Sequence, residues 1–186
     1  MPQKFIFLDR DGVINLDNGN INKKEDIELI YGAANAIRLL NENNYTTLVI
    51  TNQAVVAYGS CTIDDVQEMH THLNNLLENE GAHIDVFYFC PHHPTKGTNP
   101  LYTQPCGCRK PAPGMILQAQ EDFQIQDLSL CYLVGDKTCD ILAGSYVGCK
   151  TIMVKTGSAG LDGRYTIRPM YRAEDLNDAV QNIILR

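Results

Sequence analysis

The chain has 186 residues, of which 44% are hydrophobic and 20% are charged, a composition typical of a globular protein with a full core. Its formal net charge of -7 argues against a nucleic-acid partner, because nucleic acids bind basic faces. The N-terminus lacks the pattern of a signal peptide, and no apolar run reaches membrane-spanning length, which argues against a membrane partner. We therefore expect one domain over residues 1–186, monomeric and cytoplasmic.

The first predicted element is a buried strand over residues 4–8 that ends in two carboxylates, Asp9 and Asp11, followed by Gly12. Residues i and i+2 of an extended segment point to the same side, and two like charges this close are costly unless a cation or a shared proton offsets them. A hard cation such as Mg²⁺ would do so, leaving one carboxylate as a nucleophile and the other as an acid/base. The alternative is an Asp-Gly turn without chemistry.

Helices and strands alternate after this point. Residues 14–26 are polar and suit a short flap with a turn at 17–20, and a helix face over 33–40 follows. A β-branched strand over 46–50 ends at Thr51. The Thr51 hydroxyl could bind a phosphoryl oxygen or could instead cap the next turn.

Thr62 begins a second helix, with Asp65 completing a capping box. His70 and His72 flank the apolar stripe of this helix, and we expect them on a solvated face. A third strand is predicted over residues 84–89.

Residues 90–112 show neither period, which is uncommon for so long a segment unless it is functional or cross-linked. Three thiolates and one imidazole there predict a closed, structural Zn²⁺ site: Cys90, His92, Cys106 and Cys108. We call residues 91–112 the zinc loop. His93 is a rival ligand, and unrelated thiols or a disulfide are the alternatives. The odd cysteine count favours a reducing cytoplasm, and the other four thiols are expected to pack in the interior: Cys61, Cys131, Cys139 and Cys149.

Arg109 and Lys110 follow the last zinc ligand directly, so the zinc loop would aim two cations. Lysine suits a phosphoryl group as a point charge, and arginine can grip a second anion in a fork. The alternative is a solvated basic pair.

The last third of the chain repeats the alternation. A helix with Pro113 at its first turn precedes a buried strand over 130–134, which ends near Asp136 and Asp140. A third strand-terminal carboxylate supplies what the first pair lacks as a Mg²⁺ site. A fifth strand over 151–154 and a terminal helix complete an α/β fold, a three-layer Rossmann-like parallel sheet.

Four motifs in this order resemble those of the haloacid dehalogenase superfamily of phosphatases: D-x-D-G at 9–12, Thr51, Lys110, and G-D-x-x-x-D at 135–140. The zinc loop narrows the resemblance to the D-glycero-D-manno-heptose 1,7-bisphosphate phosphatase family, which is similar to the histidinol-phosphate phosphatases. The resemblance covers nearly the whole chain. It implies a haloacid dehalogenase-like fold with no large cap domain.

The resemblance also implies roles for residues. Asp9 is the expected nucleophile and Asp11 the acid/base, while Thr51 and Lys110 hold phosphoryl oxygens. Catalytic Mg²⁺ is expected on Asp9, Asp136 and the main-chain carbonyl of Asp11, with Asp140 orienting Lys137 or the metal's surroundings. The expected substrate-binding residues are Asp17, Asn18, Gly19, Asn20, Asn52, Gln53, Ala54, Arg109 and Lys137.

The implied substrate is a small phosphorylated sugar, first of all the heptose 1,7-bisphosphate, which would lose its 7-phosphate during lipopolysaccharide core heptose synthesis. Histidinol phosphate and other sugar phosphates are the alternatives, and a non-catalytic zinc-loop binding module is the alternative from another class. Val55 and Tyr58 stand where the family usually has Gly and Arg, so we expect a different loop shape and a weaker contact to the second phosphate.

Overall fold

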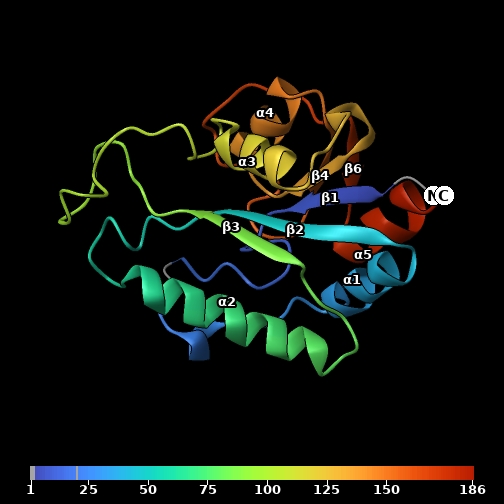
Figure 1. The fold of residues 1–186 in the computed structure, drawn as a ribbon, viewed down its shortest axis with the longest axis horizontal. Coiled ribbons are helices and arrows are strands. Elements are labelled where there is room, and N and C mark those ends of the chain that lie inside the picture. Colours follow the sequence, from blue (N-terminus) through green and yellow to red (C-terminus); the bar gives the residue numbers. More distant parts are fainter. Residues whose placement is uncertain (1–2, 20) are drawn as a thin grey trace.

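The described chain, residues 3–19 and 21–186 of the computed structural model, contains a parallel sheet of six strands (Figure 1). The strands are β1 (Lys4–Leu8), β2 (Tyr45–Asn52), β3 (Val86–Cys90), β4 (Tyr132–Gly135), β5 (Lys150–Val154) and β6 (Tyr171–Ala173). Their order is β3-β2-β1-β4-β5-β6, and all neighbours are parallel. The sheet therefore grows outward from β1 in both directions.

Helices cover both faces of this sheet, as predicted. They are α1 (Ala33–Glu42), α2 (Ile63–Glu78), α3 (Gly114–Asp122), α4 (Thr138–Tyr146) and α5 (Leu176–Ala179), with the short 3₁₀ helices η1 (Lys24–Asp26) and η2 (Leu128–Leu130) and the π-helix η3 (Val180–Ile184). Figure 1 shows α3 and α4 on one face and α1, α2 and α5 on the other. In the described part of the chain, no helix is both long and apolar enough to cross a membrane.

Strand β1 contributes buried side chains to the core on both faces of the sheet. Phe5 and Phe7 pack in the cluster beneath α3, whereas Ile6 and Leu8 pack in the cluster that includes α1 and α2. Successive side chains of a strand point to opposite faces, and a strand covered on both faces is a continuous apolar run. The apolar run of β1 is thus explained by its central place in the sheet.

The strand register brings the chemical motifs to one edge. Leu8 pairs with Val49 of β2 and with Val134 of β4. Asp9 and Asp136 directly follow β1 and β4, and Thr51 is the last residue but one of β2, so all three lie at the same carboxyl edge. Because the sheet grows in opposite directions on the two sides of β1, this edge is a topological switch point, where ligands bind in open α/β sheets.

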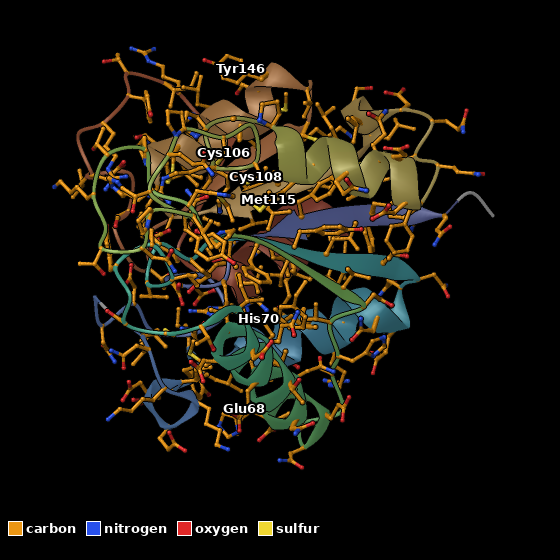
Figure 2. All side chains as sticks on the ribbon, turned by 60° about the vertical axis from the view of Figure 1, so that its left-hand side comes forward. Glu68, His70, Cys106, Cys108, Met115 and Tyr146 are labelled. Carbon is orange, nitrogen blue, oxygen red and sulfur yellow. The ribbon has the colours of Figure 1, made fainter. Side chains whose placement is uncertain are left out.

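The structure differs from the sequence-based expectations in two places. Strand β6 was not predicted, because it is only three residues long and is partly exposed. His70 is buried (5% exposed), not solvated: it lies four residues after Val66 and three before Leu73, so it extends the apolar stripe of α2. Figure 2 shows His70 on the side of α2 that faces the sheet and Glu68 on the opposite side. The predicted capping box of Thr62 and Asp65 is present.

Candidate active site

Asp9 lies at the end of β1 and is almost completely buried. Its Oδ1 accepts a hydrogen bond of 2.8 Å from the main-chain N–H of Arg10 and forms an ion pair of 2.9 Å with Nζ of Lys110. Its own N–H donates to the carbonyl of Val134 on β4, at 2.9 Å. These contacts fix the carboxylate where the central strands end.

Asp11 is held by a dense set of donors. Oδ1 accepts from Nε of Arg10 (2.8 Å) and from Asn15 (3.0 Å), and Oδ2 accepts from Gln53 (2.9 Å) and from Nη2 of Arg10 (3.0 Å). Burial raises the pKa of Asp11, but the charge of Arg10 and the hydrogen bonds outweigh it and hold that pKa below its ordinary value. Arg10 is fully buried, and sequence reasoning had given it no role.

Lys110 reaches the same point from the zinc loop. Besides Asp9, its Nζ contacts Oδ1 of Asp140 at 2.8 Å and the carbonyl of Ile50 at 2.7 Å. Its main chain exchanges hydrogen bonds with the side chain of Asn52, at 3.0 and 3.1 Å. Burial alone would lower the pKa of Lys110, but the charges of Asp140 and Asp9 outweigh it and hold this pKa above its ordinary value. The ammonium therefore stays charged.

Three buried carboxylates converge beside it. Oxygens of Asp9, Asp136 and Asp140 lie within 4.8 Å of one another, and Oδ1 of Asp136 is buried without a hydrogen-bond partner among the described residues. Burial raises the pKa of Asp9 to about 6, with Lys110 opposing it, and burial together with the charge of Asp9 raises the pKa of Asp136 to about 7. An all-oxygen set with an orphaned acceptor fits a hard divalent cation.

Two glycines make this approach possible. Gly12 has φ +84°, and a Cβ there would lie 2.6 Å from Oδ2 of Asp136. Gly157 has φ +61°, and its Cβ would lie 2.3 Å from the same oxygen. A larger residue at either position would displace the carboxylate.

The segment after β2 supports the site from the other side. Thr51 is buried, and its hydroxyl accepts a hydrogen bond of 2.9 Å from Gln53. Gln53 is 3% exposed, and its amide also bonds Asp11 and Arg10, so its side chain positions the acid/base candidate. Substrate contact by Asn52, Gln53 and Ala54 stays a prediction.

Besides the hydrogen bond from Asn15 to Asp11, an ion pair joins the predicted flap to the site. Nζ of Lys137 contacts Oδ2 of Asp17 at 2.9 Å and Oδ1 of Asp136 at 3.6 Å. Asp17 also accepts a hydrogen bond from the N–H of Gly19, which forms the predicted turn. Asn18 is exposed, and Asn20 lies outside the described residues. Asp140 accepts from the N–H of Lys137 at 3.0 Å and so fixes the start of α4.

The zinc-loop donors form one cluster. The three Sγ–Sγ distances are 3.5 Å (Cys90–Cys106), 3.1 Å (Cys90–Cys108) and 3.4 Å (Cys106–Cys108), and Nδ1 of His92 lies 3.7 and 3.6 Å from Cys90 and Cys108. These separations are too long for a disulfide, and they approach from below the edge of a tetrahedral zinc site, which is about 3.8 Å for Zn–S bonds of about 2.3 Å. Figure 2 places Cys106 and Cys108 close together.

His93, the rival ligand, faces elsewhere. Its Nδ1 accepts hydrogen bonds from the N–H groups of Thr95 (3.2 Å) and Lys96 (2.8 Å). The geometry therefore favours His92 as the fourth donor. All seven cysteines are free thiols.

The departure at Val55 and Tyr58 is accommodated without strain. In the described chain the non-glycine residues with positive φ are Asn44, Gln124 and Ala159, so Val55 does not adopt the glycine conformation. Val55 is buried instead, and the ring of Tyr58 lies 5.6 Å from that of His93. A loop shape that differs from the family's, and a weaker contact to the second phosphate, stay predictions.

This chain is 38% identical to a D-glycero-D-manno-heptose-1,7-bisphosphate 7-phosphatase of Chlorobaculum tepidum. The match covers 98% of this chain and 94% of the relative. The chain belongs to this family. A second heptose bisphosphate 7-phosphatase, from Thermosynechococcus vestitus, is 40% identical, with 97% of this chain and 95% of the relative covered. The HAD-hydrolase-like family model matches residues 107–179.

The likeness of this chain to the heptose bisphosphate 7-phosphatase family includes a solved structure with the same fold. It is a D,D-heptose 1,7-bisphosphate phosphatase from B. bronchiseptica complexed with magnesium and phosphate. The two chains superpose with a TM-score of 0.87 at 28% identity, covering 98% of this chain and 99% of the other. The predicted haloacid dehalogenase-like fold is thereby confirmed.

Sequence reasoning missed two further groups at the site. Arg164 and Cys139 line the same cavity as Asp9 and Asp11. No motif marks Arg164, which lies in a polar segment after β5, and Cys139 was expected only to pack. The segment 156–165 is held against the site by Ser158, whose N–H donates to Asp136 at 2.7 Å.

Proposed function

We propose that this chain is a Mg²⁺-dependent phosphatase that removes the 7-phosphate of D-glycero-D-manno-heptose 1,7-bisphosphate in lipopolysaccharide core heptose synthesis. The observation that carries the proposal is the meeting of Asp9, Lys110 and the Asp136–Asp140 pair at the carboxyl edge of β1 and β4. Relatives with this named activity match nearly the whole chain, which supports the substrate.

The first step is transfer of the phosphoryl group to Asp9. Both fixed contacts of Asp9 engage Oδ1, which leaves Oδ2 to attack phosphorus in line. As the new P–O bond forms, the bond from phosphorus to the sugar oxygen breaks, and Asp11 gives that oxygen a proton. Because the pKa of Asp11 lies below its ordinary value in the ligand-free site, this step requires that Asp11 take up that proton when the substrate anion binds. Thr51 and Lys110 hold the equatorial oxygens, since positioning and charge stabilisation are most of what phosphoryl transfer needs.

The second step is hydrolysis of the aspartyl-phosphate. Asp11, now a carboxylate, takes a proton from a water molecule that attacks phosphorus. The P–O bond to Asp9 breaks, which restores its carboxylate and releases inorganic phosphate. The donors from Arg10 and Gln53 keep Asp11 in one orientation through both steps.

The carboxylate set supports a magnesium site. Asp9, Asp136 and the main-chain carbonyl of Asp11 would hold the ion, and Asp140 keeps Lys110 and Lys137 in place. When bound, Mg²⁺ neutralises phosphate charge so that one anion can approach another. Zinc on the cysteine cluster would be structural, because four protein ligands fill its tetrahedron. The free thiols support work in a reducing cytoplasm.

Replacing the nucleophile tests this proposal. The Asp9→Asn variant should lose at least about 10³-fold in phosphate release, because an amide oxygen cannot form the aspartyl-phosphate. Initial rates with Mg²⁺ and the heptose bisphosphate measure this, and Asp26→Asn, the same change at an exposed position of η1, is the matched control. Steady-state turnover by folded Asp9→Asn at the control rate would remove Asp9 from its role.

A further inference from the structure

A second cavity adjoins the one that contains Asp9. The reaction cavity has a volume of about 110 Å³, and its neighbour, of about 310 Å³, lies against the zinc loop. Small-molecule sites usually measure about 300–1,000 Å³, so the reaction cavity suits a phosphoryl group but not a whole sugar bisphosphate. The neighbouring cavity supplies the missing space.

The two cavities share three cationic residues. Arg109, Lys110 and Arg164 line both of them. No aspartate or glutamate is among the residues that line the second cavity. The net charge of the chain is -7, yet three cations and no carboxylate line this cavity, so the cavity favours an anion.

The three cations differ in what already engages them. Lys110 is paired with Asp9 and Asp140. Arg109 donates to the carbonyl of His92 at 2.9 Å through Nη1 and pairs with no carboxylate in the described chain. Arg164 has neither an ion pair nor a side-chain hydrogen bond with any described residue. The two arginines therefore have donors available for a ligand.

The side chain of Arg164 is exposed, but the backbone on both sides of it is held in place. Two residues before it, the carboxylate of Asp162 accepts hydrogen bonds from the N–H (2.9 Å) and the hydroxyl (2.8 Å) of Thr138. One residue after it, the N–H of Tyr165 donates to the same hydroxyl at 3.2 Å. Nearer β5, the N–H of Gly160 donates to the carbonyl of Asp136 at 2.7 Å. The backbone at Arg164 is thus tied to the start of α4, directly beside the catalytic carboxylates.

We propose that Arg164 joins Arg109, which was already expected to bind substrate, in holding the phosphate that is not transferred, and that Arg164 thereby determines preference for a bisphosphate over a monophosphate. This inference rests on the proposed function. Planar guanidinium groups can each grip two phosphate oxygens, and one from the zinc loop and one from segment 156–165 approach the anion from two sides. The scissile phosphate stays with Asp9, Thr51 and Lys110.

Two substrates that share the reacting phosphate isolate this contact. They are the heptose 1,7-bisphosphate and the heptose 7-phosphate, which differ only in the second phosphate. Arg164→Ala should lower kcat/KM for the bisphosphate by about 10- to 100-fold, mostly through KM, and for the monophosphate by about threefold at most. Arg164→Lys should recover part of the preference, and Arg168→Ala, at an exposed arginine four residues further along the chain, is the matched control.

The ratio of the two kcat/KM values decides between outcomes. A ratio in Arg164→Ala equal to that of the wild type would overturn the proposal: with an equal loss on both substrates, Arg164 would act by supporting its segment, and with no loss it would not contact the substrate. A wild-type enzyme with equal kcat/KM on both substrates would overturn it as well. A wild-type enzyme that releases phosphate from neither substrate would instead defeat the proposed function itself.

Discussion

His70 lies inside the apolar face of α2, stacked on Phe87 with ring centroids 4.6 Å apart and edge-on to Phe89 at 5.5 Å. Its Nε2 has no hydrogen-bond partner in the described chain. Burial, aided by the charge of Arg10 and opposed by that of Asp11, lowers the pKa of His70 to about 3. The imidazole is therefore neutral and packs as an aromatic ring, beside a cation that the catalytic network needs.

This burial predicts acid-sensitive stability. The folded pKa of about 3 lies below the ordinary 6.5, so the unfolded chain binds the proton more readily and stability falls as pH drops from about 6.5 toward 3. At pH 5 the cost is on the order of 2 kcal/mol. Urea unfolding at pH 7.5 and pH 5 should show that His70→Phe loses less stability than the wild type. Equal losses in both proteins would show that His70 does not titrate in this way.

At the scale of elements, the zinc loop makes the catalytic arrangement depend on an irregular segment (Figure 1, yellow-green). It carries the zinc-ligand candidates Cys106 and Cys108 immediately before Arg109 and Lys110. Lys110 is buried between two carboxylates, so the position of the loop sets the charge balance around Asp9. A segment without helix or strand needs such a cross-link to hold a buried cation at a defined point.

Loss of one zinc ligand should therefore weaken both stability and catalysis. Cys106→Ser should lose bound zinc, lower Tm by about 5 °C or more, and lower kcat/KM for phosphate release with Mg²⁺ in excess. Zinc content by atomic spectroscopy, thermal melts and initial rates measure this. Cys61→Ser is the matched control, because Cys61 lies outside the cluster and is also half-buried. Zinc content and Tm equal to those of the control would refute a zinc site here.

How far the sequence predicted these elements depended on how local each signal was. Strand β1 was predicted with its observed bounds, because a run of apolar residues ends sharply at Asp9. Strand β6 was missed, because three partly exposed residues carry no periodic signal. The Asp11 network with Arg10 was missed for another reason: a buried arginine is identified only by its partners, and Gln53 lies 43 residues away.

At the scale of the whole molecule, the enzyme must bind a highly charged anion although its own net charge is -7. The fold solves this by placing cations from separate segments at one sheet edge: Arg109, Lys110, Lys137 and Arg164 line a single cavity. The buried carboxylates among them would be offset by Mg²⁺. Helices on both faces fix the sheet, and loops supply Arg109 and Arg164 to the cavity at that edge.

The most direct test is Mg²⁺-dependent phosphate release from a panel of substrates at matched concentrations. The panel contains the heptose 1,7-bisphosphate, histidinol phosphate, several sugar monophosphates and p-nitrophenyl phosphate. We expect at least about tenfold higher kcat/KM for the heptose bisphosphate, release of one phosphate per molecule, and the 1-phosphate as product. Equal rates across the panel, or a lead for histidinol phosphate, would contradict the assignment of a heptose bisphosphate as the substrate.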